Sequence, residues 1–442
     1  MLHCRKLLFS ILIASLAISY RAFAQENLTY RGIDSVTYRQ YLDGDYVQLQ
    51  QLANKAFDVT IDFYDLRMRV AIACYNQQNY EAALPHFLRA YQMNPADTIV
   101  QEYVYYTYLF SARSEDAAAF AENASDIFRE KIGYKKKWID YVGWSNIAGL
   151  AGNTSIDNQT NLKGASNIYG ETTLNQTIFG TTAYFQNSFT NRLHIINGIS
   201  LFNTHSEQII QTANSSKFTS FSDIHYQYNL ATLYQFQQGW SLGAAFVYYN
   251  NNPSSFSWTA TTNTFLPSVT NSSDSHATII TLGKRFPYIQ MVVSEAMSNL
   301  LSVKQYQTET QLIYYPLGNL NLYTVSSVAY IDNGGTEQWV LMQKIAKKIA
   351  DYLYCDMSFS YGNHTNYITS SGFITYNTAA KIQWIGGLNC DFFFNKFTLS
   401  LGYSLDKREF QSWQYNLASQ NTSASTQTYF NNAIKTNIKW NF

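Results

Sequence analysis

The sequence predicts an N-terminal α-helical repeat region followed by an antiparallel transmembrane β-barrel of about 14 strands. Three observations support this α plus membrane all-β fold class. Apolar residues recur every three or four positions in the first third of the chain, then alternate with polar residues, and short and long gaps separate the alternating segments. The expected domains are a signal peptide at 1–24, helical repeats at 25–134 and the barrel at 135–442.

The composition excludes several protein classes. The chain has 442 residues with 30 basic and 30 acidic side chains, so the electrostatic footprint of a nucleic-acid-binding protein is missing. Charged residues make up 14%, well below the ~25% of soluble domains, while aromatic residues reach 16%. Much of the polarity comes from Asn, Gln, Ser and Thr, which fits neither a helical membrane bundle nor a disordered chain.

The first residues have the pattern of a secretory signal peptide. Arg5 and Lys6 precede an apolar run, 7–18, which ends near an Ala22-Phe23-Ala24 cleavage signal. This run is too short to span a hydrocarbon core of ~30 Å as a permanent anchor. We therefore expect cleavage before Gln25 and export across the inner membrane.

Three cysteines follow the expected cleavage site: Cys74, Cys355 and Cys390. A sparse, odd-numbered set does not indicate a disulfide framework. Cys355 and Cys390 lie on strands that we expect to be neighbours, on their lipid-facing side. All three are expected to act as small hydrophobic side chains.

A 34-residue period marks the helical region, as in Leu49, Ala83 and Ala117. It defines three repeats, 30–63, 64–97 and 98–131. The middle repeat resembles a tetratricopeptide repeat through the family's small, aromatic and proline positions, here Ala71, Ala83, Phe87, Ala90 and Pro95. The flanking repeats lack the proline, which Ile61 and Arg129 replace. An unrelated small helical bundle is the alternative.

Tetratricopeptide stacks expose a concave groove that binds peptides or partner helices. The resemblance therefore implies an unidentified periplasmic protein partner that docks on the helical repeats. A tyrosine-rich helix is the candidate groove surface: Tyr103, Tyr105, Tyr106 and Tyr108. Packing inside the helical core is the alternative role for these side chains.

Beyond the basic linker at 135–137, apolar and polar residues alternate in segments such as 221–236, 351–362 and 396–406. A soluble sandwich would show the same alternation, so the loops must distinguish the two. Short turns are expected at the following positions: 191–192, 237–239, 286–287, 316–319, 347–348 and 395–396. Longer, mostly polar loops are expected at 153–175, 208–220, 251–275, 365–374 and 411–427. This arrangement is typical of an outer-membrane barrel.

The last strand alternates apolar and polar residues and ends on an aromatic side chain, with Ile438, Trp440 and Phe442 on one face. This pattern resembles the signal read by the machinery that inserts outer-membrane barrels. The last strand must also pair with the first, because unpaired backbone in lipid costs several kcal/mol per group. The barrel-insertion machinery and outer-membrane lipids are therefore expected partners.

The lumen is expected to be narrow or partly plugged, since 14 strands lie between self-filled eight-stranded barrels and open porins. Its polar lining carries scattered charges without a ring of one sign. The expected inward residues are His225, Gln227, Asn229, Asp356, Lys381, Asp391, Asp406, Lys435 and Lys439. Such a lining suits neutral glycans, and it is also common in porins generally. No catalytic, metal or cofactor motif is recognised, so an enzyme is not expected.

The overall plan resembles two-part exopolysaccharide exporters, in which a periplasmic tetratricopeptide scaffold precedes an outer-membrane barrel, and the tetratricopeptide–barrel fusions of Bacteroidota. The resemblance covers the domain order and the motif at 64–97, while those exporters have longer scaffolds and typically 16 strands. It implies a channel or assembly factor in the outer membrane of a Gram-negative bacterium, with periplasmic repeats, that exports a polysaccharide or protein. A passive uptake porin and a non-conducting structural or adhesive surface protein are the alternatives.

Overall fold

The computed structural model describes residues 28–152, 168–211, 216–252, 256–258, 265–267, 273–369, 372–376, 381–416 and 421–442. The predicted signal peptide lies outside these residues, as do parts of the predicted long loops. The chain divides into two compact units, Met1–Thr107 and Tyr108–Phe442, and each is described by itself. Within the described residues, no helix combines the length and apolar character needed to cross a membrane.

The helices follow the predicted 34-residue spacing. They are α2 (Tyr30–Asp43), α3 (Tyr46–Asp58), α4 (Tyr64–Asn76), α5 (Tyr80–Met93), α6 (Thr98–Phe110), α7 (Ser114–Glu122) and α8 (Asp126–Lys131). Helices α2, α4 and α6 begin 34 residues apart, as do α3, α5 and α7. The first unit contains α2 to α5 and most of α6, and the second unit begins within α6.

Small side chains fill the core of the first unit. Ala71, Ala83, Phe87 and Ala90 are fully buried, so the helices can approach closely around a single large ring. Pro95 is exposed and follows the end of α5, and its carbonyl accepts a hydrogen bond from the Gln101 side chain. The residues chosen from sequence for repeat packing thus occupy one core and one helix end.

A half-buried imidazole, His86, lies between α3, α4 and α5. His86 Nδ1 lies 2.9 Å from Arg67 Nη1, and the ring stacks on Phe57 at 5.7 Å. Burial, with the neighbouring Arg67 charge, lowers the pKa of His86 to about 4. Arg67 and Arg89 both bind Asp62, and the hydrogen bond from Arg67 is the main cause that lowers the pKa of that carboxyl.

We expect the first unit to lose stability as the pH falls from about 6.5 to 4. In that window His86 takes up a proton in the unfolded chain but stays neutral in the folded one, which disfavours folding by roughly 3 kcal/mol at the lower limit. Asp62 contributes stability that is lost only at lower pH, as the pH falls through its depressed pKa. Thermal unfolding followed by circular dichroism at 222 nm measures this slope in the full chain. His86→Gln should flatten the slope between pH 6.5 and 4, and an unchanged slope would exclude His86 as its source.

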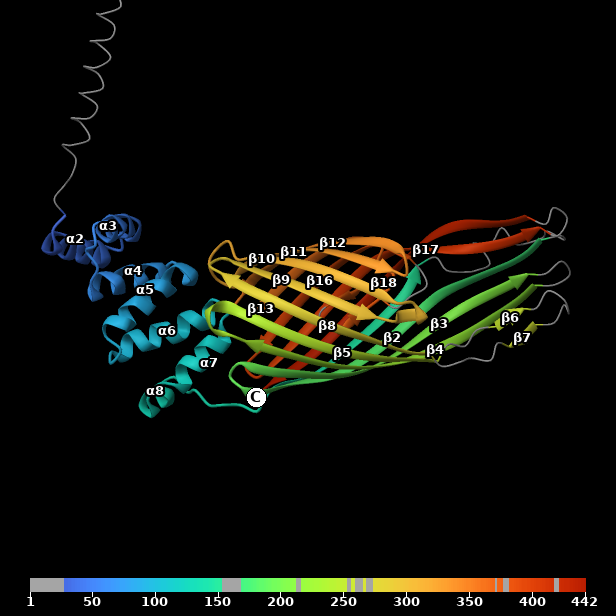
Figure 1. The fold of residues 1–442 in the computed structure, drawn as a ribbon, viewed down its shortest axis with the longest axis horizontal. Coiled ribbons are helices and arrows are strands. Elements are labelled where there is room, and N and C mark those ends of the chain that lie inside the picture. Colours follow the sequence, from blue (N-terminus) through green and yellow to red (C-terminus); the bar gives the residue numbers. More distant parts are fainter. Residues whose placement is uncertain are drawn as a thin grey trace, which may run out of the picture. The chain divides into compact units, whose positions relative to one another are not determined.

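Fourteen strands form a closed antiparallel barrel, which confirms the predicted fold class. Its strands are β1 (Ile139–Gly152), β2 (Ile168–Thr190), β3 (Leu193–Gln211), β4 (Ser216–Gln235), β5 (Trp240–Asn252), β8 (Ser273–Phe286), β9 (Ile289–Ser298), β10 (Gln305–Tyr314), β11 (Leu322–Asn333), β12 (Thr336–Ala350), β13 (Leu353–Gly362), β16 (Lys381–Phe394), β17 (Phe397–Asn416) and β18 (Asn421–Asn441). Each pairs with its sequence neighbour in the barrel, and β18 closes the ring on β1 (Figure 1).

Two short hairpins and two 3₁₀ turns complete the described elements. They are β6 (Phe256–Trp258) with β7 (Phe265–Pro267), β14 (Ile368–Thr369) with β15 (Ile374–Thr375), η1 (Gln237–Gly239) and η2 (Leu300–Ser302). The barrel strands differ in length. β2, β3, β4, β17 and β18 have 19 to 23 residues, whereas β9, β10 and β13 have 10.

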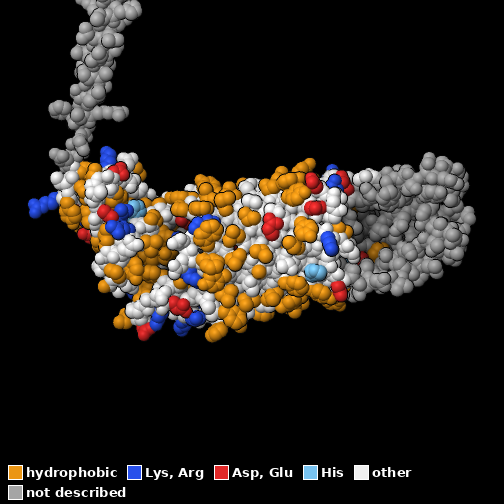
Figure 2. Space-filling model, in the orientation of Figure 1, with side chains coloured by type: hydrophobic (Ala, Val, Ile, Leu, Met, Phe, Trp, Pro, Cys, Tyr) orange, Lys and Arg blue, Asp and Glu red, His pale blue; other side chains and the backbone are white. Residues whose placement is uncertain are grey.

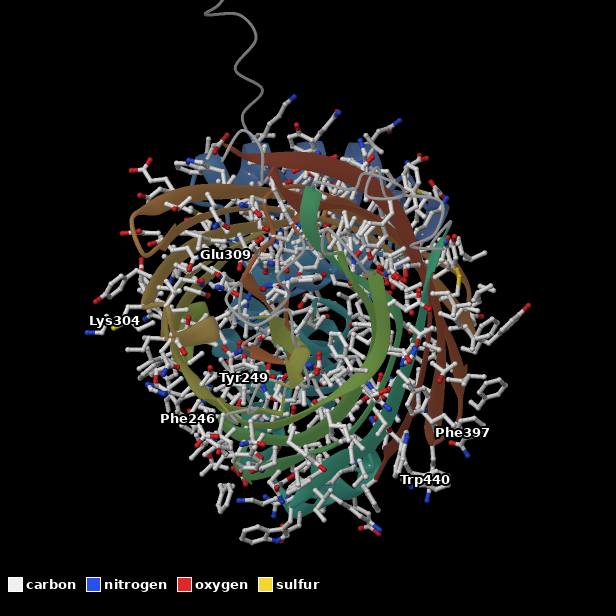
Figure 3. All side chains as sticks on the ribbon, turned by 90° about the vertical axis from the view of Figure 1, so that its right-hand side faces the viewer. Phe246, Tyr249, Lys304, Glu309, Phe397 and Trp440 are labelled. Carbon is white, nitrogen blue, oxygen red and sulfur yellow. A yellow bond between two sulfur atoms is a disulfide. The ribbon has the colours of Figure 1, made fainter. Side chains whose placement is uncertain are left out.

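The barrel is apolar outside and largely polar inside, as the alternation predicts. On β4, Ile224, Tyr226 and Tyr228 are exposed, whereas Gln227 and Asn229, at alternate positions, are buried. Figure 2 shows hydrophobic side chains over much of the visible outer face of the barrel. Phe246, Phe397 and Trp440 point outward in the end-on view, and Tyr249 and Glu309 point inward (Figure 3).

One predicted turn is displaced. The sequence places a turn at 347–348, but β12 continues to Ala350 and β13 begins at Leu353. The pairing between these strands shifts register between Lys348 and Ala350. The shift interrupts the alternation of apolar and polar residues before the strand ends. The two lysines therefore resemble a turn in the sequence, although both are paired with residues of β13.

Cys355 and Cys390 form a disulfide, which corrects the expectation that both are free. They stand directly opposite each other on β13 and β16, with Cα atoms 4.2 Å apart. An odd cysteine count indicates no framework, yet it does not exclude one bridge between neighbouring strands. Cys74 is buried in the first unit and is free.

Candidate functional site: the lumen and its plug

The segment between β13 and β16 folds back into the lumen, and we call its described residues, 363–369 and 372–376, the plug. The sequence places 365–374 among the long rim loops, and the structure corrects this. Tyr367 and Ile368 are buried, and the plug forms its own hairpin, in which Ile368 pairs with Thr375. Burial of these apolar side chains inside the barrel is the physical reason.

Amide side chains of the barrel hold the plug backbone. Asn229 Nδ2 and Gln227 Nε2 donate to the carbonyl oxygen of Gly372, at 2.7 and 3.0 Å. On β10, Gln305 donates to the Asn366 carbonyl at 2.9 Å. Gln307 donates to the Ile368 carbonyl at 2.6 Å and accepts from the Ile368 N–H at 3.1 Å. We call Gln227, Asn229, Gln305 and Gln307 the amide latch.

The plug tip fits tightly against the wall. Gly372 has φ +86°, and a Cβ placed there would lie 2.2 Å from Val247 Cγ2, so a glycine is required on both counts. Phe373 packs over Gly198 on β3, where a Cβ would come within 2.7 Å of the ring. The hydrogen bonds from β4 and β10, together with this close packing, hold the plug in a defined position.

Two further hydroxyl contacts and an imidazole secure the plug. Tyr249 and Thr375 share a hydroxyl–hydroxyl bond, and Tyr367 donates to Glu309 Oε1 at 3.2 Å. At the plug's base, His364 is fully buried, with Nδ1 3.0 Å from the Ile382 carbonyl oxygen. His225, also expected in the lumen, is half-buried two residues before Gln227 on β4.

Acidic side chains on β13 and β16 lie in one hydrogen-bonded group. Asn389 donates to Asp356 at 3.3 Å and to Asp391 at 3.1 Å. Lys344 Nζ on β12 lies 3.4 Å from the Asp356 carboxylate. Two of the residues assigned to the lumen from sequence are thus brought together.

Asp406 and the C-terminal lysines lie on β17 and β18. Asp406 is buried and accepts hydrogen bonds from Arg408 and from Asn431. Lys435 stands opposite Gly402, and the Lys439 ammonium lies 5.2 Å from the centre of the Tyr141 ring.

Lys381 is placed differently from the expectation. Its side chain is about half exposed and pairs with Glu409 at 3.1 Å, whereas the adjacent Ile382 is fully buried. The pairing of β16 with β17 shifts register between Ile382 and Trp384. Because one bulge reverses the side on which residues point, simple alternation from the strand centre misplaces this end.

Helix α7 and the turn before it contact the rim of the barrel within the second unit. Arg192, in the β2–β3 turn, donates to Asp116 at 3.2 Å, and Arg113 binds the same carboxylate. Arg285 at the end of β8 donates to the Ser111 carbonyl at 2.6 Å. The last helices are therefore joined to one end of the barrel.

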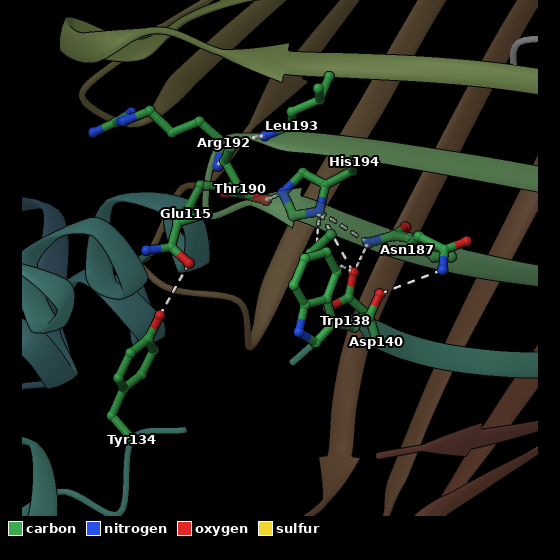
Figure 4. A network of polar contacts seen from close by, with 12 residues as sticks. Glu115, Tyr134, Trp138, Asp140, Asn187, Thr190, Arg192, Leu193 and His194 are labelled. Atoms are coloured by element: carbon green, nitrogen blue, oxygen red, sulfur yellow. Dashed lines mark hydrogen bonds and ion pairs between the residues drawn. The ribbon is translucent and has the colours of Figure 1, made fainter. Parts of the chain in front are cut away.

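A polar network continues from α7 to β1 and β3 (Figure 4). Ser188 Oγ donates to Asp140 at 2.5 Å and lies 2.8 Å from His194 Nδ1, and His194 Nε2 lies 3.9 Å from Glu115. The serine hydroxyl is thus within hydrogen-bonding distance of both a carboxylate and an imidazole. Within the described residues, no group of three or more His, Cys, Asp and Glu side chains is placed to hold a metal ion.

The four tyrosines expected to line a partner groove are all half-buried. Tyr103 stacks on Phe87 with ring centres 4.8 Å apart, and Tyr105 and Tyr106 contact each other at 5.2 Å. In the second unit, Arg113 lies over the Tyr108 ring at 4.9 Å. Tyr103 therefore takes part in core packing.

Sequence reasoning missed the plug, although a signal for it exists. Inward positions on several strands are apolar where alternation with polar residues is expected, as at Val247, Ile279 and Val325. Apolar residues on both faces of a strand indicate that both faces are covered. The plug and its neighbourhood provide that second cover.

No protein-family model matches the chain, and no curated protein does. Solved structures similar to it include a bacterial polysaccharide outer membrane secretin, at 9% identity and TM-score 0.35, covering 68% of this chain and 98% of that one. A TodX monoaromatic hydrocarbon channel mutant has 9% identity and TM-score 0.46, covering 71% and 92%. A FadL homologue from Pseudomonas aeruginosa has 8% identity and TM-score 0.44, covering 76% and 94%. We draw no functional conclusion from likenesses at these TM-scores.

Proposed function

We propose that the chain is an outer-membrane channel for small solutes, closed in the described state by its plug. The supporting observation is the amide latch. Its bonds join side chains to a folded-back hairpin instead of extending the strand ladder of the wall. Water can replace such bonds one by one, so the plug can leave the lumen while the barrel stays closed on itself.

The placement in the outer membrane rests on the barrel surface. In a closed barrel, every strand pairs its backbone hydrogen-bonding groups with two neighbours, whereas an open sheet in lipid would leave its edge strands unpaired. The apolar outer face of the barrel is also stable in contact with lipid. The predicted export signal and the alternating last strand agree with that compartment.

Measurements of ion conductance test whether the chain forms a channel that the plug closes. The full chain in a planar bilayer should show little current, and a variant in which a Gly-Ser bridge replaces 365–375 should show stable open-channel steps. Heat-modifiable migration on a gel serves as the folding control for both proteins. Absence of current from the folded deletion variant would contradict a channel and favour a structural or adhesive surface protein.

Export of a surface polymer is the second candidate, favoured by the three 34-residue helix pairs, which resemble a docking module. Such a module would bring an unidentified periplasmic protein to the channel. Deleting 30–97 removes α2 to α5 and leaves the α7 contacts with the rim in place. Unchanged surface polymer and unchanged co-purifying proteins in this variant would exclude the export role.

A further inference from the structure

A cavity of about 490 Å³ lies beside the plug, against the wall formed by β8 to β12. Ile368, Thr369 and Gly372 of the plug close one side, and Tyr315, Leu320 and Tyr323 line it near the β10–β11 turn. Cavities of roughly 300–1,000 Å³ are the size that holds small-molecule ligands in proteins. The cavity is therefore large enough for a solute in transit.

Apolar side chains form somewhat more than half of the lining of this part of the lumen. Six of them, from five strands and the plug, face the cavity: Ile279, Val292, Ile313, Val325, Met342 and Ile368. The wall of β13 and β16 to β18 has carboxylates, amides and lysines at its inward positions instead. One sector of the lumen is thus richer in apolar side chains than the other.

Most polar side chains that line the cavity already have partners in the protein. Gln307 is bound to the Ile368 backbone, and Glu309 accepts from Tyr367. Lys344 pairs with Asp356, and the Thr281 and Ser294 hydroxyls lie 3.1 Å apart. A sugar needs donors and acceptors that are free to bind its many hydroxyls, and a site that leaves those hydroxyls unpaired binds it poorly. An apolar solute needs no such partners and covers the apolar part of the wall.

We propose that this cavity binds small, mainly apolar solutes in preference to neutral sugars. A role for this binding in transport rests on the proposed channel function, but the binding itself can be measured without conductance. Because plug residues form part of the cavity wall, a bound solute contacts the plug directly.

The test is binding of 4-fluorophenol to the full chain in lipid nanodiscs, followed by fluorine-19 NMR, with empty nanodiscs as the background. Val292→Phe fills the cavity, and Val293→Phe adds the same ring to the next residue of β9, which faces outward. We expect saturable binding that Val292→Phe weakens at least tenfold and Val293→Phe leaves unchanged. Maltose, the sugar probe, should not displace 4-fluorophenol.

Two outcomes would overturn the proposal: displacement of 4-fluorophenol by maltose, or equal binding by wild type and Val292→Phe. Heat-modifiable migration shows whether each variant is folded, and Val292→Leu provides a milder variant if the phenylalanine prevents folding. If binding behaves as expected while the plug-deletion variant carries no current, the cavity proposal stands and the channel proposal fails.

Discussion

Replacing all four residues of the amide latch by alanine is expected to open the channel. Each buried neutral hydrogen bond contributes about 1 kcal/mol, and the latch makes five bonds to the plug backbone. Their loss should raise the ratio of open to closed channels by roughly three to four orders of magnitude. Single-channel recording in planar bilayers measures the open fraction directly.

The latch prediction has a matched control on the lipid side. Gln343 lies on β12 and bonds the Ser326 hydroxyl on the outer face, so Gln343→Ala removes a glutamine without touching the plug. The control should remain closed. The pairs Gln227/Asn229 and Gln305/Gln307 should each give a smaller increase, because the other pair still holds the plug. A quadruple variant as closed as wild type would show that the latch does not control the plug.

Removing the last five residues is expected to abolish the folded barrel. Residues 438–441 pair with β1 on one side, and 438–440 pair with β17 on the other. The Phe442 N–H also donates to the Asp140 carbonyl. Truncation therefore leaves backbone groups unpaired on two strands, at several kcal/mol each in lipid. The heat-modifiable form in outer-membrane fractions should fall below detection, while Ile434→Ala, an outward substitution, should leave it unchanged.

A second variant separates ring closure from recognition by the insertion machinery. Replacing Ile438, Trp440 and Phe442 by alanine keeps every backbone pair of the last strand. If these side chains form the insertion signal, the variant should refold in detergent but fail to reach the outer membrane in cells. Normal insertion of this variant would mean that strand pairing, not a terminal signal, is what the cell requires.

The strands could be predicted because each lies between lipid and a mostly polar lumen, which imposes a period of two on the sequence. That rule fails wherever the surroundings change. Val247 and Ile279 face inward yet are apolar, because the plug covers them. Lys381 faces away from its expected side because one bulge reverses the alternation.

The contacts between the plug and the barrel wall could not be predicted from the sequence either. The plug resembles a surface loop in sequence, because Tyr367 and Ile368 are the only large apolar side chains in its first half, 363–369. The amide latch joins residues more than 60 positions apart, and in one case 145. Nothing in the local pattern of Gln227 or Gln305 distinguishes a latch residue from ordinary lumen lining.

The unequal strands give the outer opening of the barrel a slanted outline. At about 3.3 Å per residue, the ten or so additional residues of β2 to β4, β17 and β18 extend the wall about 30 Å farther along those strands. They do so at the end away from the C-terminus, whereas β9, β10 and β13 stop short. In the proposed outer-membrane setting, the longer strands form a raised wall on one side of the barrel opening. Solutes that enter the proposed channel from the cell surface would then pass over the low side, next to the sector that carries the cavity.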